Sequence, residues 1–177
     1  APLVLDVGTG CGALGLAVAW AVPEARVWAT DISAAAGAVA RANTRRLGLS
    51  GRVRCAVADL LPPSPRRFDV VVANLPYVAE TERDEMDPEV LRFEPSEAVM
   101  AGPDGLAAIR RLLEALPDRL APDGAVGLEI GWRQGAEVAR LARERFPGAE
   151  VRVRPDLAGR DRVVAIDRRS VDRAGPT

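Results

Sequence analysis

Short apolar segments alternate along the chain with longer segments in which apolar residues recur at helical spacing. The predicted elements are, in order, strand 3–7, helix 11–21, strand 26–30, helix 33–47, strand 53–57, strand 68–73, helix 105–116, strand 125–130, helix 134–146, strand 150–154 and strand 162–167. Pro23 ends the first helix, Ser33 is suited to cap the second, and Gly48 is suited to end it. Residues 78–100 lack a clean period and carry many acids, which is typical of a long functional loop with at most one helical turn.

This order of elements predicts an α/β fold with helices on both faces of a mostly parallel sheet. The last two strands are joined by a tight turn that contains Gly159, too short for a crossover helix, so that pair must be antiparallel. The sequence therefore predicts a seven-stranded sheet in which five parallel strands are followed by a C-terminal antiparallel hairpin.

The bulk properties of the chain exclude several classes of protein. Its 177 residues suit one domain, predicted over residues 1–168, followed by a polar tail at 169–177. There is no apolar run of the roughly 20 residues that a membrane span needs and no secretory leader, so a cytoplasmic protein without a membrane partner is expected. The net charge of -1 gives no support for direct nucleic-acid binding.

The absence of histidine excludes any mechanism that needs an imidazole base. With only two cysteines, Cys11 and Cys55, neither a disulfide framework nor a metal site is expected.

A glycine-rich turn and three following residues predict a nucleotide-type cofactor. The turn, Gly8, Thr9, Gly10, Cys11 and Gly12, lies between the first strand and the first helix, where glycines let a ligand approach main-chain N–H groups. Asp31, after the second strand, can accept hydrogen bonds from ribose hydroxyls. Asp59, after the third, is placed to meet an adenine amino group, and Leu60 can pack on the ring.

The glycine spacing also fits a dinucleotide-binding dehydrogenase. Asp59 and the short chain favour a methyltransferase that binds S-adenosylmethionine over that alternative.

Asn74, Leu75, Pro76 and Tyr77 follow the fourth strand and form the predicted catalytic and substrate-binding tetrapeptide. Strands one and four flank the switch point of the sheet, so this segment, Asn74 included, should also face the cofactor. The Asn74 side-chain oxygen and the Leu75 carbonyl can accept hydrogen bonds from a planar NH2 group and orient its nitrogen. Pro76 restricts Leu75 to extended backbone, and Tyr77 can stack on the substrate. A simple turn after a strand is the alternative.

The chain resembles the HemK/PrmC family of release factor glutamine N5-methyltransferases, which have a Rossmann-like class I methyltransferase fold. The matching stretches are 5–12, 74–77, 92–95, 128–131 and 156–162, of which Asp156-Leu-Ala-Gly-Arg-Asp-Arg162 is the most particular to the family. The resemblance implies S-adenosylmethionine as the cofactor, bound by Gly8–Gly12, Asp31 and Leu60. It implies as substrate the glutamine of a Gly-Gly-Gln segment in a release factor, held by residues 74–77. Glu94 would lie beside that glutamine or would pair with Arg92.

The chain departs from the family in two respects. Leu75 stands where the family usually has proline, and the family's N-terminal helical domain has no counterpart in a chain that starts inside the first strand. Three alternatives stay open: a ribosomal-protein glutamine methyltransferase, an enzyme that methylates an exocyclic amine of a nucleic acid base, and a non-catalytic module that binds S-adenosylmethionine.

Overall fold

The computed structural model describes residues 1–79, 81 and 101–171. Most of the long segment predicted at 78–100, including Arg92 and Glu94, therefore lies outside the described residues. The elements are β1 (Leu3–Val7), α1 (Ala13–Ala21), β2 (Arg26–Asp31), α2 (Ala34–Arg46), β3 (Val53–Val57), β4 (Phe68–Ala73), α5 (Ala107–Ala115), β5 (Leu120–Glu129), α6 (Gly135–Arg145), β6 (Glu150–Pro155), β7 (Asp161–Asp167) and the 3-10 helix η2 (Arg168–Val171).

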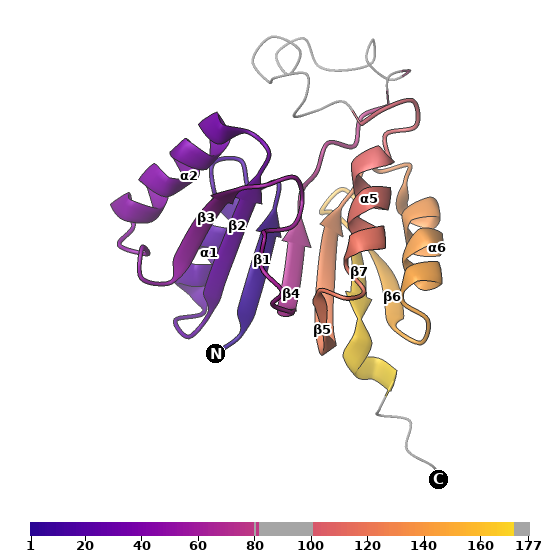
Figure 1. Cartoon of the computed structure of the whole chain (residues 1–177). Helices are drawn as coiled ribbons and strands as arrows, with labels where there is room; N and C mark the ends of the chain where they lie inside the picture. Colours follow the sequence, from indigo (N-terminus) through magenta and orange to yellow (C-terminus); the bar gives the residue numbers. More distant parts are fainter. Residues whose placement is uncertain (80, 82–100, 172–177) are drawn as a thin grey trace.

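The seven strands form one sheet in the order β3-β2-β1-β4-β5-β7-β6 (Figure 1). Strands β1 to β5 are parallel to their neighbours, whereas β7 is antiparallel to both β5 and β6. The predicted mostly parallel sheet with a terminal antiparallel hairpin is confirmed. The sequence did not predict that β7 would insert between β5 and β6, which makes β6 the edge strand.

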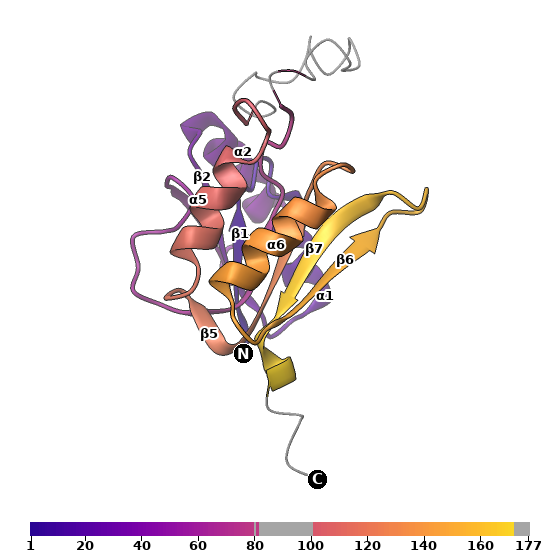
Figure 2. The same cartoon turned by 90° about the vertical axis from the view of Figure 1, so that its right-hand side faces the viewer.

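Helices α1 and α2 cover one face of the sheet, and α5 and α6 cover the other (Figures 1 and 2). A smaller apolar cluster under α1 includes Val4, Leu16 and Val27. A larger cluster packs α5 and α6 against the centre of the sheet and includes Phe68 and Leu112. The central strand β1 is therefore buried from both sides, with Val4, Leu5 and Val7 at most 2% exposed.

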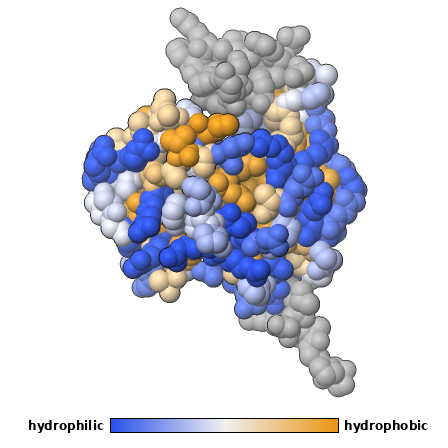
Figure 3. Space-filling view, in the orientation of Figure 1, coloured by the Kyte–Doolittle hydropathy of each residue, from blue (hydrophilic) through white to orange (hydrophobic). Residues whose placement is uncertain are grey.

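Among the described residues, no helix covers the half of the second face that is formed by β1, β2 and β3 (Figure 1). The connection from β3 to β4, residues 58–67, is described throughout and contains none, because it is rich in proline. In Figure 3, apolar surface shows among polar residues over this part of the sheet. At the C-terminus, η2 extends the described fold into the predicted tail, and the Arg168 guanidinium donates to the carbonyl of Leu120 at 3.3 Å. In the described part of the chain, no helix has the length and apolar character that crossing a membrane requires.

Candidate active site

The glycine turn after β1 has backbone angles that residues other than glycine rarely adopt. Gly8, Gly10 and Gly12 have φ angles of +67°, +57° and +92°. Helix α1 therefore begins at Ala13, two residues later than the predicted start at Cys11, because Gly12 occupies the position before the helix in a left-handed conformation. The turn lies at the carboxyl end of β1, beside the switch point where β1 meets β4, as the sequence predicted.

Asp31 fixes this turn. One of its carboxylate oxygens accepts from the Gly10 N–H at 2.8 Å, and the other accepts from the Ser33 N–H at 2.8 Å. The N–H of Thr9 also donates to the carbonyl of Thr30 at 2.9 Å. A carboxylate oxygen can accept two hydrogen bonds, and each oxygen of Asp31 accepts one here. Asp31 therefore keeps acceptor capacity for a ligand while it orients the loop.

A buried carboxyl group that the sequence did not single out, Asp6, lies beneath the turn at 1% exposure. Its Oδ2 accepts from the Thr9 hydroxyl at 2.5 Å and from the Gly15 N–H at 2.9 Å. Burial raises the pKa of Asp6, and the hydrogen bonds from Thr9 and Gly15 oppose that rise in part. Asp6 thus braces the turn from below. An acid inside an otherwise apolar strand was the signal in the sequence.

Asp59 and Leu60 follow β3 on the same edge of the sheet. The Asp59 carboxylate pairs with Arg111 of α5, with 2.5 Å between Oδ2 and Nη2, and both side chains are at least half exposed. Leu60 has a φ angle of +63°, and its carbonyl accepts from the Thr30 hydroxyl at 2.6 Å. An adenine amino group would therefore share the Asp59 carboxylate with Arg111 or displace it.

The tetrapeptide after β4 packs directly against the glycine turn. A Cβ atom added to Gly8 would lie 2.9 Å from the Leu75 side chain and 3.4 Å from the Asn74 carbonyl oxygen. Leu75 is 5% exposed and belongs to the larger core cluster, so its side chain anchors the segment where the family usually has a rigid proline. The structure therefore brings together the two motifs that the sequence singled out.

Some hydrogen-bond acceptors of the Asn74–Tyr77 segment are already bonded, and others are not. The Asn74 side chain is exposed, and within the described part of the chain neither it nor the Leu75 carbonyl takes part in a hydrogen bond. The Tyr77 carbonyl, in contrast, accepts from Gln134 at 2.8 Å. Among the described residues, the Asn74 side chain and the Leu75 carbonyl thus keep their hydrogen-bonding capacity unused.

Gln134, another residue without a role in the sequence analysis, joins three loops around Tyr77. Its Oε1 accepts from the Gly131 N–H at 2.9 Å, while its Nε2 donates to the carbonyls of Tyr77 at 2.8 Å and Gly105 at 3.4 Å. Gly105 has a φ angle of +71°, and a Cβ there would lie 2.3 Å from the Tyr77 carbonyl oxygen. A glutamine at the start of a helix carries no distinctive pattern, so the sequence could not reveal this contact.

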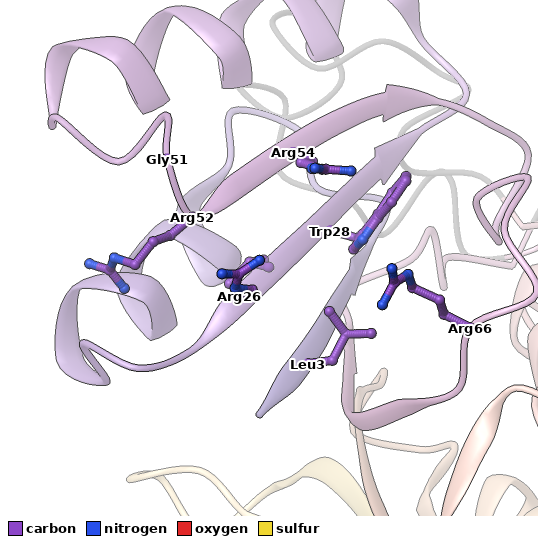
Figure 4. Close-up of a pocket in the computed structure, with 8 residues that line it drawn as sticks. Leu3, Arg26, Trp28, Gly51, Arg52, Arg54 and Arg66 are labelled. Atoms are coloured by element: carbon purple, nitrogen blue, oxygen red, sulfur yellow. The ribbon is translucent and has the colours of Figure 1, made fainter. Parts of the chain in front are cut away.

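A cavity of about 90 Å³ opens elsewhere, on the half of the second sheet face that no described helix covers. It is lined by Leu3, Arg26, Val27, Trp28, Gly51, Arg52, Arg54 and Arg66. Figure 4 shows the guanidinium groups of Arg54 and Arg66 directed toward the Trp28 ring, whereas Arg52 points away. Arg26 and Leu3 lie at the amino-terminal ends of their strands, so this cavity is separate from the predicted crevice.

Among the described residues, no group of three or more histidine, cysteine or acidic side chains is placed to hold a metal ion.

A family described as a methyltransferase domain matches residues 4–93, which include the glycine turn, Asp31 and the tetrapeptide. The chain belongs to this family. The chain is 46% identical over 165 residues to the release factor glutamine methyltransferase of Bordetella pertussis, with 92% of this chain and 60% of that protein covered. It is 44% identical over 167 residues to the release factor glutamine methyltransferase of Moorella thermoacetica, with 94% and 59% covered. The resemblance to the HemK/PrmC family is confirmed.

The chain spans about three fifths of the length of these curated relatives. Its structure is similar to the crystal structure of a methyltransferase from Pyrococcus furiosus, with a TM-score of 0.69 and 18% identity over 95% of this chain and 75% of that chain. This similarity confirms the predicted Rossmann-like class I methyltransferase fold.

Proposed function

We propose that this domain transfers a methyl group from S-adenosylmethionine to the side-chain amide nitrogen of a glutamine in a peptide chain release factor. The observation that carries the proposal is the packing of the Asn74–Leu75 segment against a glycine turn of the kind that cradles a cofactor, with the Asn74 side chain and the Leu75 carbonyl in no hydrogen bond among the described residues. The names of the curated relatives support the choice of substrate.

The residues of the crevice fit S-adenosylmethionine. A Cβ on Gly10 would meet nothing within 4 Å, so the main chain of the turn is open at Gly10 to close approach of the cofactor. Asp31 would accept hydrogen bonds from the ribose hydroxyls through its remaining lone pairs, and Leu60 would pack on the adenine. When bound, the cofactor supplies a sulfonium-activated methyl group.

The chain positions the substrate amide, and no general base is needed before the methyl transfer. The methylated nitrogen then loses its extra proton to solvent. The Asn74 side-chain oxygen and the Leu75 carbonyl would each accept one N–H of the glutamine NH2 group, which points its nitrogen toward the methyl donor. Tyr77 would lie against the planar amide, held by the bond from Gln134 to its carbonyl. Positioning of this kind can supply much of a rate acceleration, because it replaces a random encounter by a fixed near-attack geometry.

The test is methyl transfer to recombinant release factor with labelled S-adenosylmethionine, followed by mass spectrometry of the modified residue. We expect one methyl group on a glutamine amide. The Asn74→Ala variant should lose at least about 100-fold in kcat, the scale of a lost transition-state hydrogen bond, while its cofactor affinity stays within a few-fold.

Methylation of a different residue type would refute the proposed substrate. Wild-type turnover by Asn74→Ala would refute the proposed role of that side chain. Cofactor binding without any transfer would favour the non-catalytic alternative. A cytoplasmic location, also predicted from the sequence, is part of this proposal.

A further inference from the structure

Two loops at the carboxyl end of the sheet expose large apolar side chains that the proposed methyl transfer does not use. Trp132, directly after the β5 strand, is 49% exposed, and Leu157, between β6 and β7, is fully exposed. Strand β6 runs parallel to β5, so the turn after β6 lies at the same edge of the sheet as the loops after β4 and β5 (Figure 2). Exposed apolar residues gathered near a site often mark a surface that a partner covers.

The turn that carries Leu157 is held by a dense set of hydrogen bonds. The Asp156 Oδ1 accepts from the N–H groups of Ala158 at 2.9 Å and Arg160 at 3.0 Å, and the Asp156 N–H donates to the Arg160 carbonyl at 2.7 Å. Gly159 supplies the positive φ angle, +77°, that closes the turn. This turn is part of the 156–162 run that the sequence analysis found most particular to the family.

Arg162 connects the turn to the loop that follows β5. Its guanidinium donates to the Asp156 carboxylate at 3.3 Å and to the Ile130 carbonyl at 3.2 Å. The Ile130 N–H in turn donates to the Arg162 carbonyl at 2.9 Å. The two exposed loops therefore form one rigid unit, in which the apolar side chains are held outward.

Arginines flank the exposed tryptophan. The Arg133 guanidinium carbon lies 4.4 Å from the centre of the Trp132 ring, and that of Arg160 lies 5.8 Å from it. Such contacts orient the ring and keep positive charge beside it. This surface also borders the predicted substrate segment, because a Cβ on Gly131, next to Trp132, would lie 3.4 Å from the Tyr77 ring.

We propose that Trp132, Leu157 and Arg160, here called the rim patch, dock the protein substrate while its glutamine enters the crevice. The proposal rests on the proposed function and adds to it the surface that recognises the folded substrate. The complementary partner surface would offer an apolar side chain to Trp132 and Leu157 and a carboxylate to Arg160. The aliphatic Leu157 favours a protein over a nucleic acid, because it offers nothing to a phosphate backbone.

The test compares steady-state methyl transfer to release factor by the wild type and by Trp132→Ala, Leu157→Ser and Arg160→Glu. We expect KM for release factor to rise about 10-fold in each variant, the effect of losing one interfacial anchor of about 1.4 kcal/mol. The kcat and the affinity for S-adenosylmethionine should stay within two-fold, because no rim-patch side chain reaches the reacting atoms. The Arg160→Glu defect should shrink at high salt.

Matched controls come from the opposite side of the molecule. Trp20 of α1 is 69% exposed, so Trp20→Ala removes an exposed tryptophan outside the rim patch, and Arg45→Glu of α2 reverses an exposed charge. Both should leave KM unchanged. If the wild type methylates release factor and the rim-patch variants keep its KM, the docking proposal alone is overturned. If the wild type transfers no methyl group to release factor, the proposed function fails and the docking proposal with it.

Discussion

The side-chain amide of Gln134 donates a hydrogen bond to the main-chain carbonyl of Tyr77, with 2.8 Å between Nε2 and the oxygen. The two residues lie in loops that follow neighbouring strands, β4 and β5. The same amide holds Gly131 through its oxygen, so one side chain sets the spacing between both loops. Gln134 is therefore a positioning residue for the predicted substrate segment.

Replacing Gln134 by leucine should lower kcat about 10-fold to 100-fold while the affinity for S-adenosylmethionine changes little. The Tyr77 and Gly105 carbonyls lose their donor, at a cost of about 1–3 kcal/mol for a buried polar group left unpaired, and the segment can shift. Methyl transfer kinetics and calorimetry of cofactor binding measure the two effects separately.

Glu137→Gln serves as the control for this variant, because Glu137 lies in helix α6, which begins directly after Gln134, and bonds only the exposed Arg140 among the described residues. A Gln134→Leu enzyme with normal kcat would contradict the positioning role. A matching loss of cofactor affinity would indicate a general structural defect instead.

Asp31→Ala should weaken binding of S-adenosylmethionine by about 10-fold to 100-fold while the fold is kept. The variant removes the predicted ribose acceptor and also releases the N–H groups of Gly10 and Ser33. Calorimetry gives the dissociation constant, and circular dichroism verifies the fold. Asp59→Ala is the informative comparison. Asp59 forms a solvent-exposed ion pair with Arg111, so it should contribute less than Asp31 to the binding of S-adenosylmethionine. An unchanged dissociation constant in Asp31→Ala would refute the ribose role.

The sequence predicted the parts of the fold that depend on periodicity and chain length. Strand β1 was predicted at its observed bounds, and the short connection around Gly159 required the antiparallel pairing of β6 and β7. Strand β5 begins at Leu120, five residues before the predicted start at 125, because its first part reads as a polar turn, Pro122-Asp123-Gly124, and pairs irregularly with β4. Local pattern does not indicate such long-range pairing.

In the candidate site, too, some residues could be predicted from the sequence and others could not. Gly8, Asp31 and Asn74 could be placed from sequence because each directly follows a predicted strand of a parallel sheet, and those ends share one edge. The roles of Asp6 and Gln134 could not be predicted from the sequence, because both residues act through contacts with residues that only the folded chain brings near. Gln134 and Tyr77 are 57 residues apart in sequence.

Gly105→Ala should destabilise the fold more than Gly48→Ala does. Both glycines have positive φ angles, +71° and +69°, so both variants incur the backbone cost of about 1–2 kcal/mol. A Cβ on Gly48 meets nothing within 4 Å, whereas one on Gly105 would lie 2.3 Å from the Tyr77 carbonyl oxygen. Thermal and urea unfolding should separate the two. Equal stability losses would mean that the loop around Tyr77 moves freely.

Asp6 predicts a specific dependence of stability on pH. Burial raises the pKa of this carboxyl group above its ordinary value of 3.8, so the unfolded chain ionises at a lower pH than the folded one. As pH rises from about 3.8 through the raised pKa of the folded state, the wild type loses the stability that a protonated Asp6 contributes. Above that pKa the loss is complete and constant.

Asp6→Asn removes this titration but keeps the size of the side chain. The difference in free energy of unfolding, wild type minus variant, should therefore fall with rising pH in that window and be flat above it. Asp104 and Asp167 act with the opposite sign, because arginine partners lower the pKa of each carboxyl group and their contribution is lost as pH falls. Both are unchanged in the variant, so they cancel in the difference. A difference that is constant across the window, measured by urea unfolding at a series of pH values, would show that burial does not disfavour the charged form of Asp6.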